Sequence, residues 1–229
     1  MQDISIDHSL YSESVKERLK AVEHLLAGDE SDLKILQDWM VDTRDNYLDL
    51  ALGKAYQALY LNPSKQIREF LYHNFPSGTV PLESAREIDY QSLQQLLARQ
   101  EFQQADVLTL QKMCEIAGTA AVERKWIYFT EVASLPKIDL ITLDLLWQMS
   151  SVGKFGFSVQ RRIWLSVGKD YTKLWPKINW KSGNSWTRYP QEFTWDLSAP
   201  QGHLPLSNQL RGVRVIDAIF DHPAWKDAS

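Results

Sequence analysis

Cysteine is almost absent from this chain, since Cys114 is the only one among 229 residues. A single cysteine cannot form an internal disulfide, which fits a reducing compartment. Its position in a helical run predicts a small, buried apolar side chain. Long apolar runs are also missing. The longest, 138–147, is interrupted by Asp139 and Asp144, whereas a membrane helix needs roughly 20 apolar residues.

Signatures of catalysis and metal binding are missing as well. The five His residues are dispersed, and no HExxH, P-loop or dinucleotide-binding pattern occurs. Glu192 and Asp196 are the one carboxylate pair we consider for acid–base chemistry, but their spacing in a loop defines no geometry. His203 has no second ligand at metal-binding spacing. We therefore expect neither a catalytic residue nor a metal site.

Targeting segments are not evident either. The opening residues, MQDISIDHSL, lack the basic region followed by an apolar region that marks a secretory signal. They are also acidic rather than rich in Arg and Ser, which argues against a transit peptide.

Charge and tryptophan are distributed unevenly. The net charge is −4, yet residues 150–229 hold 11 Lys and Arg against 6 Asp and Glu, and 6 of the 9 Trp. A positive, aromatic-rich segment favours a flat or anionic partner. The basic residues are scattered and form no nucleic-acid motif, so we expect no nucleic-acid partner.

Helical periodicity dominates the chain, and strand-like alternation is almost absent, which predicts an all-α protein. Four short amphipathic helices predict an N-terminal bundle over 1–78, ended by the breakers of 75–78. The remainder, 79–229, is expected to form an all-helical core. The helices we expect span 14–27, 32–41, 47–61, one starting at 64, 90–99, 102–117, 139–149, 158–167, 170–174 and 206–220.

One long segment, 179–204, has neither helical nor strand periodicity. Structureless connections of this length are uncommon in compact domains and are usually functional or disordered. Disordered segments are poor in aromatic residues, so we expect this one to be ordered. It forms either a binding surface or an additional layer of the core.

Two arginines follow this segment at helical spacing. Arg211 and Arg214 would share one face of the last helix, and a guanidinium binds carboxylates bidentately and stacks on rings. They form either a clamp for an anionic ligand or a solvated helix face with local ion pairs. The neighbours Arg161 and Arg162 are expected to form surface or interdomain salt bridges.

Three segments resemble a known family. KWIYFTEV (125–132), GKFGFSVQRRIWL (153–165) and KLWPKINWKSGNSWTRYPQEFTWDLSAPQGHLPLSNQLRGVRV (173–215) are similar to the genomes-uncoupled-four family. The resemblance extends over about 81–225, and residues 1–78 match only weakly. Cyanobacterial-type members also carry an N-terminal helical bundle, whereas plastid members carry a transit peptide.

The resemblance implies a cupped, aromatic-lined groove that binds protoporphyrin IX and Mg-protoporphyrin IX as ligands, with no prosthetic group. Members often have Trp where this chain has Tyr189, which keeps a ring but adds a hydroxyl. The residues that the resemblance and the aromatic segment assign to the groove are Trp126, Phe129, Val132, Trp186, Arg188, Tyr189, Phe193, Arg211 and Arg214.

The resemblance also implies a function without chemistry of its own. Members activate magnesium chelatase in chlorophyll synthesis and work with its large porphyrin-binding subunit. We expect a cytoplasmic monomer of the cyanobacterial type, with peripheral association at the thylakoid membrane left open. The alternatives are a bilin-binding sensor and an enzyme that acts on a tetrapyrrole through Glu192 or Asp196.

Overall fold

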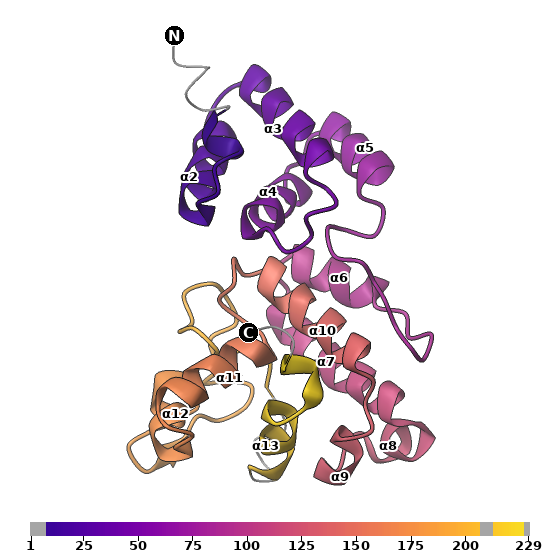
Figure 1. The fold of residues 1–229 in the computed structure, drawn as a ribbon, viewed down its shortest axis with the longest axis vertical. Coiled ribbons are helices and arrows are strands. Elements are labelled where there is room, and N and C mark those ends of the chain that lie inside the picture. Colours follow the sequence, from indigo (N-terminus) through magenta and orange to yellow (C-terminus); the bar gives the residue numbers. More distant parts are fainter. Residues whose placement is uncertain (1–7, 207–212, 227–229) are drawn as a thin grey trace. The chain divides into compact units, whose positions relative to one another are not determined.

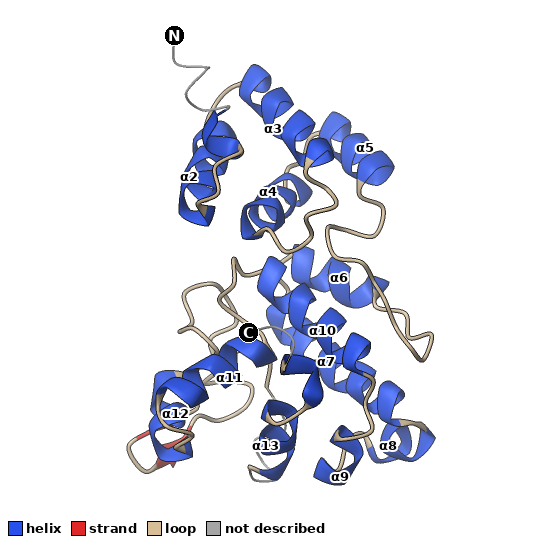
Figure 2. Cartoon of the chain, in the orientation of Figure 1, coloured by secondary structure: helices blue, strands red, loops and turns tan. Residues whose placement is uncertain are grey.

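A computed structural model describes residues 8–206 and 213–226. Over these ranges the chain is built from helices, and the strands β1 and β2 form one short hairpin (Figures 1 and 2). The prediction of an all-α fold is confirmed. The helices are α2 (Val15–Leu26), α3 (Glu30–Asp42), α4 (Leu50–Tyr60), α5 (Lys65–Asn74), α6 (Gln91–Ala98), α7 (Phe102–Ala117), α8 (Thr119–Arg124), α9 (Phe129–Val132), α10 (Lys137–Met149), α11 (Phe157–Ser166), α12 (Tyr171–Lys177), α13 (Arg214–Phe220) and the 3-10 turn η2 (Pro223–Trp225).

The chain divides into two compact units. One comprises Met1–Pro81 with Met149–Val152, and the other comprises Leu82–Gln148 with Gly153–Ser229. In the first unit, α2 packs against α3 and α4, and α5 packs against α4. A buried ion pair joins two of these segments, because Arg18 Nε lies 2.8 Å from Asp49 Oδ2. Asp49 also accepts a hydrogen bond from the Ala51 backbone N–H and so caps α4.

The second unit has an aromatic core between α7, α10 and the start of α11. The ring of Phe102 stacks on Trp147 at 5.9 Å and meets Phe155 edge-on at 5.5 Å. The Trp147 indole N–H donates to Thr109 Oγ1 at 3.0 Å. Since Trp147 and Phe102 are at most 1% exposed, this bond satisfies the indole N–H away from water.

The aspartates that interrupt the apolar run 138–147 organise neighbouring loops. Asp139 is fully buried and accepts hydrogen bonds from the hydroxyls of Ser84 and Tyr90. Asp144 accepts from the Ser158 backbone N–H at 2.9 Å at the start of α11. Both carboxyl groups therefore have hydrogen-bond partners in the core, as buried polar groups require.

The helices expected from the sequence occur near the expected positions, with several differences, among them the start of α4 at Leu50 and not at 47. Helix α8 was not predicted. Residues 126–132, which are too short to classify by period, include α9. Helix α12 continues past Leu174 to Lys177. The last described helix begins at Arg214 rather than 206, Leu206 is not helical, and 207–212 lie outside the described residues.

The long segment after α12 is folded onto α11 and is not an open loop. The Gln160 amide donates to the carbonyls of Gly202 at 3.0 Å and Pro205 at 2.8 Å. Gly202 has φ 77°, and a Cβ there would lie 2.7 Å from Ile163 Cδ1. This close approach needs glycine. Within the segment, β1 (Lys181–Ser182) and β2 (Ser185–Trp186) pair around the turn residues Gly183 and Asn184.

Candidate functional site

At the turn between α8 and α9, Arg124 pairs with a carboxylate and lies over two aromatic rings. Arg124 Nη2 lies 2.8 and 2.7 Å from the two carboxylate oxygens of Glu131. The same guanidinium lies over the rings of Tyr128, at 4.4 Å, and Trp126, at 5.2 Å. The Tyr128 backbone N–H donates to Glu131 at 2.7 Å and, more than Arg124, keeps the pKa of that carboxyl below its usual value.

The candidate residues in 126–132 differ in how much of their surface is exposed. Trp126 is half-buried and contacts Arg124 and Tyr128. Val132 is completely buried, so in this structure it is a core residue. Phe129 leaves 40% of its surface exposed. A half-exposed phenylalanine at a helix start is available to a ligand without any change in the core.

Phe129 has a charged partner from the far end of the chain. Helix α9 packs against α13, and Arg214 Cζ lies 5.3 Å from the centre of the Phe129 ring. Arg214 is exposed, and none of the described carboxylates lies within ion-pair distance of it. The structure thus joins one predicted ring and one predicted arginine in a cation–π pair whose charge no described carboxylate compensates. Arg211 lies outside the described residues.

A stack of rings leads from α12 to the hairpin. Trp175 stacks on Trp180 at 5.6 Å with an interplanar angle of 6°, and Trp186 lies 5.8 Å from Trp175. Trp180 is 1% exposed, whereas Trp186 is 46% exposed. Lys181 Nζ lies 5.4 Å from the Trp186 ring. Trp186 is therefore an exposed ring that lies on a buried aromatic base.

A second group of rings surrounds His203. Phe193 lies 5.7 Å from Trp195, 6.0 Å from Tyr189 and 4.9 Å from His203. Phe193 is buried, and Tyr189 and Trp195 are partly exposed. Burial raises the pKa of the Tyr189 hydroxyl. The expected additional core layer is therefore present, and the segment also presents rings at the surface.

His203 holds this layer together and has no ring nitrogen left for a metal. Its Nε2 accepts from the Thr194 backbone N–H at 3.1 Å, so its proton lies on Nδ1 and is donated to the Ile178 carbonyl at 2.7 Å. The His203 carbonyl accepts from the Trp180 indole at 2.8 Å. Burial lowers the pKa of the imidazole, which stays neutral. Among the described residues, no group of three His, Cys, Asp or Glu could hold a metal ion.

The two carboxylates considered for catalysis hold local turns. Glu192 accepts the Arg188 backbone N–H at 2.8 Å and lies 3.9 Å from the Arg188 side chain. Asp196 accepts the Ser198 backbone N–H at 2.7 Å, and hydrogen bonds from Ser198 keep its pKa below the usual value. The Arg188 side chain is 84% exposed, and its described ion-pair partner is Glu192. Each carboxylate thus has a local structural partner.

Asp106 is a polar residue of the site region that was not predicted. It is 5% exposed on α7 and accepts the Leu206 backbone N–H at 2.6 Å. Burial raises the pKa of its carboxyl to about 7, and its charge acts on Tyr189. The sequence held a signal for it, because Phe102, Asp106, Thr109 and Met113 share helical spacing and all four are buried.

The partner of Arg161 also differs from the expected salt bridge. Its Nε donates to the Phe220 carbonyl at 2.7 Å, so it caps the end of α13 and forms no salt bridge among the described residues. Cations at a helix C-terminus are favourable because they meet free carbonyls and the negative end of the helix dipole.

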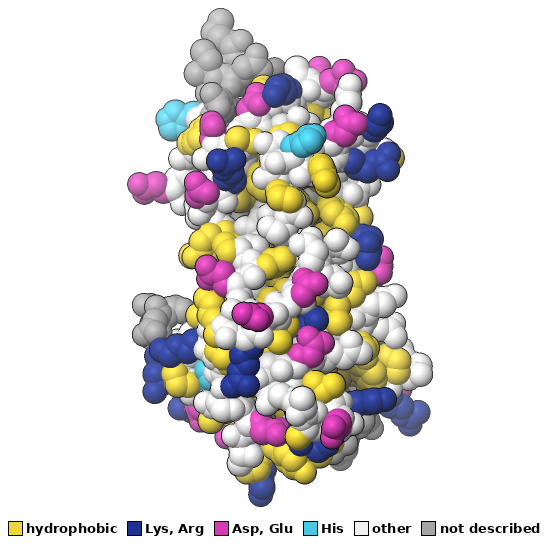
Figure 3. Space-filling model, turned by 90° about the vertical axis from the view of Figure 1, so that its right-hand side faces the viewer, with side chains coloured by type: hydrophobic (Ala, Val, Ile, Leu, Met, Phe, Trp, Pro, Cys, Tyr) yellow, Lys and Arg dark blue, Asp and Glu magenta, His cyan; other side chains and the backbone are white. Residues whose placement is uncertain are grey.

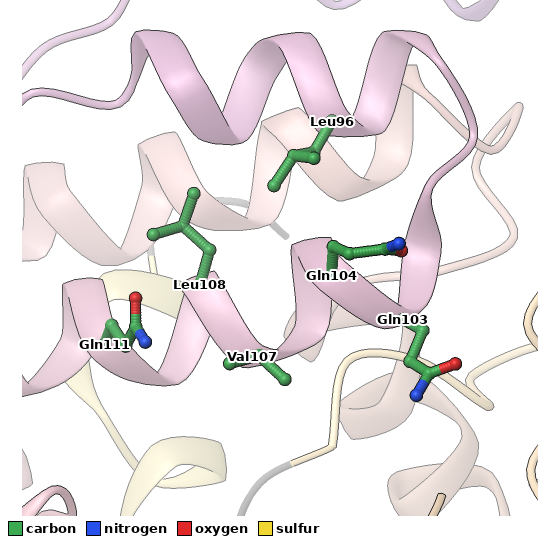
Figure 4. A pocket seen from close by; sticks show the side chains of 6 residues that line it. All are labelled: Leu96, Gln103, Gln104, Val107, Leu108 and Gln111. Carbon is green, nitrogen blue, oxygen red and sulfur yellow. The ribbon is translucent and has the colours of Figure 1, made fainter. Parts of the chain in front are cut away.

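A separate cavity of about 430 Å³ lies between α6 and α7 (Figure 4). Leu96 points from α6 toward Leu108 of α7, and glutamines line the rim. Its lining carries no charge and none of the predicted site residues: Leu96, Gln103, Gln104, Val107, Leu108 and Gln111. It therefore does not match the expected anionic ligand.

On the face in Figure 3, acidic and basic side chains are interspersed rather than gathered into a field of one sign. Within the described ranges, no helix combines the length and apolar character needed to cross a bilayer.

Residues 83–223 match the family described as GUN4-like, and residues 2–76 match the ARM-like repeat domain, GUN4-N terminal. The chain belongs to the GUN4 family. This confirms the resemblance read from 125–132, 153–165 and 173–215. The ARM-like match in the first unit was not predicted, because no repeat is discernible there in the sequence.

Relatives of this GUN4-family chain include full-length and partial matches. A Ycf53-like protein of Synechocystis sp. (strain ATCC 27184 / PCC 6803 / Kazusa) is 50% identical and aligns over 96% of this chain and 95% of its own. A tetrapyrrole-binding protein, chloroplastic, of Arabidopsis thaliana is 40% identical over 59% of this chain and 55% of its own. The structure of GUN4 from Chlamydomonas reinhardtii superposes with a TM-score of 0.61 at 41% identity, covering 64% of this chain and 94% of that one.

Proposed function

We propose that this GUN4-family protein is a non-catalytic porphyrin carrier that binds protoporphyrin IX and Mg-protoporphyrin IX and activates magnesium chelatase. Three features support the proposal: the Phe129–Arg214 pair, the exposed ring of Trp186, and the relative from Arabidopsis thaliana that is named a tetrapyrrole-binding protein.

The Phe129–Arg214 pair is the observation that carries the proposal. A protoporphyrin is a flat apolar macrocycle with two propionates on one edge. Phe129 offers an exposed ring for the macrocycle, and Arg214, 5.3 Å from the ring centre, offers a guanidinium for a propionate. Apolar contact beside a few placed polar groups is what binding sites for such ligands require.

The rings of 179–204 supply further contact area. Trp186 leaves 46% of its surface in water although its base, Trp175 and Trp180, is buried. A rigid indole that is already positioned loses little conformational freedom on binding. Offset stacking adds about 0.5–1.5 kcal/mol per aromatic pair beyond area burial.

The protein is proposed to supply no chemistry. Glu192 and Asp196 are hydrogen-bonded within their own turns, and both ring nitrogens of His203 bond to backbone groups. A magnesium porphyrin, when bound, would take water or another oxygen donor as its further ligand, because Mg²⁺ prefers oxygen. Activation would come from delivering substrate to the large chelatase subunit or receiving its product.

The test is a pair of titrations on the full chain. Quenching of Trp fluorescence measures binding of protoporphyrin IX, Mg-protoporphyrin IX and a bilin competitor. A second assay measures magnesium insertion by chelatase with and without the protein. We expect saturable porphyrin binding, no chemical change of the porphyrin by the protein alone, and faster insertion when both proteins are present.

Each arm can overturn part of the proposal. Absence of porphyrin binding would reject the carrier function altogether. Binding without faster insertion would reject the role in activation. Displacement of porphyrin by a bilin at lower concentration would favour a linear-tetrapyrrole sensor, and turnover by the isolated protein would favour an enzyme.

A further inference from the structure

Helix α13 carries a possible competitor for the proposed ligand. Arg214 is its first residue and Asp217 follows three positions later. Residues three apart on a helix are neighbours on one face, and opposite charges at this spacing attract. An Arg214–Asp217 ion pair would neutralise the guanidinium that the proposed function assigns to a propionate.

The structure does not contain this ion pair. Asp217 Oδ1 instead accepts a hydrogen bond from the Tyr171 hydroxyl at 2.5 Å. Arg214 lies over Phe129, on the neighbouring helix α9. In Figure 1, α13 lies between α12, which begins with Tyr171, and α9. Arg214 and Asp217, the two charged residues of α13, thus contact partners on different helices.

Tyr171 is well suited to this role because its ring cannot move freely. It stacks on Trp175 at 5.1 Å with an interplanar angle of 21°, and lies 5.6 Å from Trp164. Burial, with Asp217 and Asp221 nearby, raises the pKa of the hydroxyl. The hydroxyl therefore stays protonated at neutral pH and remains a donor to Asp217.

The other end of α13 is fixed independently. Arg161 Nε donates to the Phe220 carbonyl at 2.7 Å, and the apolar face of the helix, including Val215 and Ile219, is buried. Loss of the Tyr171 hydroxyl alone would therefore leave α13 in place. Only the partner of Asp217 would change.

We propose that Tyr171 holds Asp217 away from Arg214 and thereby keeps the guanidinium free for a ligand carboxylate. This inference rests on the proposed porphyrin binding and identifies Tyr171 as a positioning residue. Its consequence is a preference for porphyrins with free propionates, because only these draw on the uncompensated charge of Arg214.

The test compares Tyr171→Phe with the double variant Tyr171→Phe/Asp217→Asn. Phenylalanine keeps the ring between Trp164 and Trp175 but leaves Asp217 free to pair with Arg214. Asparagine keeps the size of Asp217 and removes its charge. Each protein is titrated with protoporphyrin IX and with its dimethyl ester, which has the same macrocycle but no carboxylates.

We expect Tyr171→Phe to raise the Kd for protoporphyrin IX about two- to fivefold, as suits an exposed ion pair at this spacing, and to leave the Kd for the ester unchanged. The double variant should return to the wild-type Kd. Equal weakening of both ligands, or no restoration in the double variant, would mean a purely structural role and overturn the inference. An unchanged Kd for protoporphyrin IX in Tyr171→Phe would overturn it too.

Failure of the proposed function gives a different result. The wild-type protein would then bind neither protoporphyrin IX nor its ester, and the inference would fall with it. Wild-type binding followed by any of the contrary outcomes above rejects the role of Tyr171 alone.

Discussion

The guanidinium carbon of Arg214 lies 5.3 Å from the centre of the Phe129 ring. The two residues come from α13 and α9, helices that are far apart in the sequence and pack together. A cation over a half-exposed ring is attracted by the ring quadrupole, so the pair orders a charge beside an apolar surface before any ligand arrives.

Replacing Arg214 tests the charge directly. Arg214→Ala should weaken protoporphyrin IX binding about 5- to 20-fold, because a charge-assisted hydrogen bond is lost. Arg214→Lys should retain part of the affinity, since it keeps the charge but not the bidentate geometry. Fluorescence titrations at low and high salt measure both effects. A wild-type affinity that does not fall with salt would contradict an electrostatic contact with the propionates.

Trp186 and Trp180 form a matched pair for separating binding from stability. Trp186→Ala removes a ring that is 46% exposed and should lower porphyrin affinity with little change in unfolding free energy. Trp180→Ala removes a ring that is 1% exposed and hydrogen-bonded to the His203 carbonyl. It should lower the free energy of unfolding by about 3–5 kcal/mol. Urea unfolding and porphyrin titration distinguish them. Unchanged affinity in Trp186→Ala would remove this ring from the site.

His203 should be needed for stability and not for metal binding. His203→Ala leaves the Thr194 N–H and the Ile178 carbonyl without partners and should cost about 2–4 kcal/mol. Burial lowers its pKa, so its contribution is complete above the unfolded pKa and is lost as pH falls below about 6.5, when the unfolded chain takes up the proton.

The measurement is urea unfolding between pH 5 and 8, together with the absorption spectrum of bound Mg-protoporphyrin IX. His203→Ala should remove this part of the pH dependence. A shifted spectrum in a variant that remains folded would indicate ligation of the metal by His203.

Asp106 should produce a pH dependence of the opposite sign. Burial raises the pKa of its carboxyl to about 7 from 3.8. Between these values the folded protein holds a proton that the unfolded chain has released, so stability falls as pH rises from about 4 to 7. Asp106→Asn keeps an acceptor for the Leu206 N–H and should be more stable than the wild type at pH 8 by on the order of 2–4 kcal/mol.

Unfolding of wild type, Asp106→Asn and Asp106→Ala at pH 5 and pH 8 checks this expectation. Asp106→Ala, which lacks the acceptor, should not share the gain. A difference between Asp106→Asn and wild type that is the same at both pH values would contradict burial of an ionisable carboxyl at this position.

The sequence predicted what depends on local spacing. Helix α7 was expected at 102–117 and is observed at Phe102–Ala117, because its apolar period and the following Gly118 both act locally. The hairpin around Gly183 was not predicted, since two residues per strand are too few for alternation to be visible. The role of Arg161 depends on Phe220, a partner that no local pattern encodes.

The candidate site shows the same division. Phe129 was named through family resemblance, and Arg214 through its helical spacing from Arg211 as well. Their contact depends on the packing of α9 on α13. Val132 was expected in the groove and is completely buried. The side on which a residue of a four-residue helix lies is set by its neighbours in the fold and not by periodicity.

The exposure of Trp186 and Phe129 has a consequence for heat resistance. Two large rings that leave 46% and 40% of their surfaces in water forgo stabilisation that a closed surface would gain. A porphyrin that covers them would raise the melting temperature by mass action, by an amount that grows with the logarithm of its concentration over its Kd. Variants of this chain selected for thermal stability in the absence of porphyrin should therefore replace these two rings early. The selected variants should bind porphyrin more weakly.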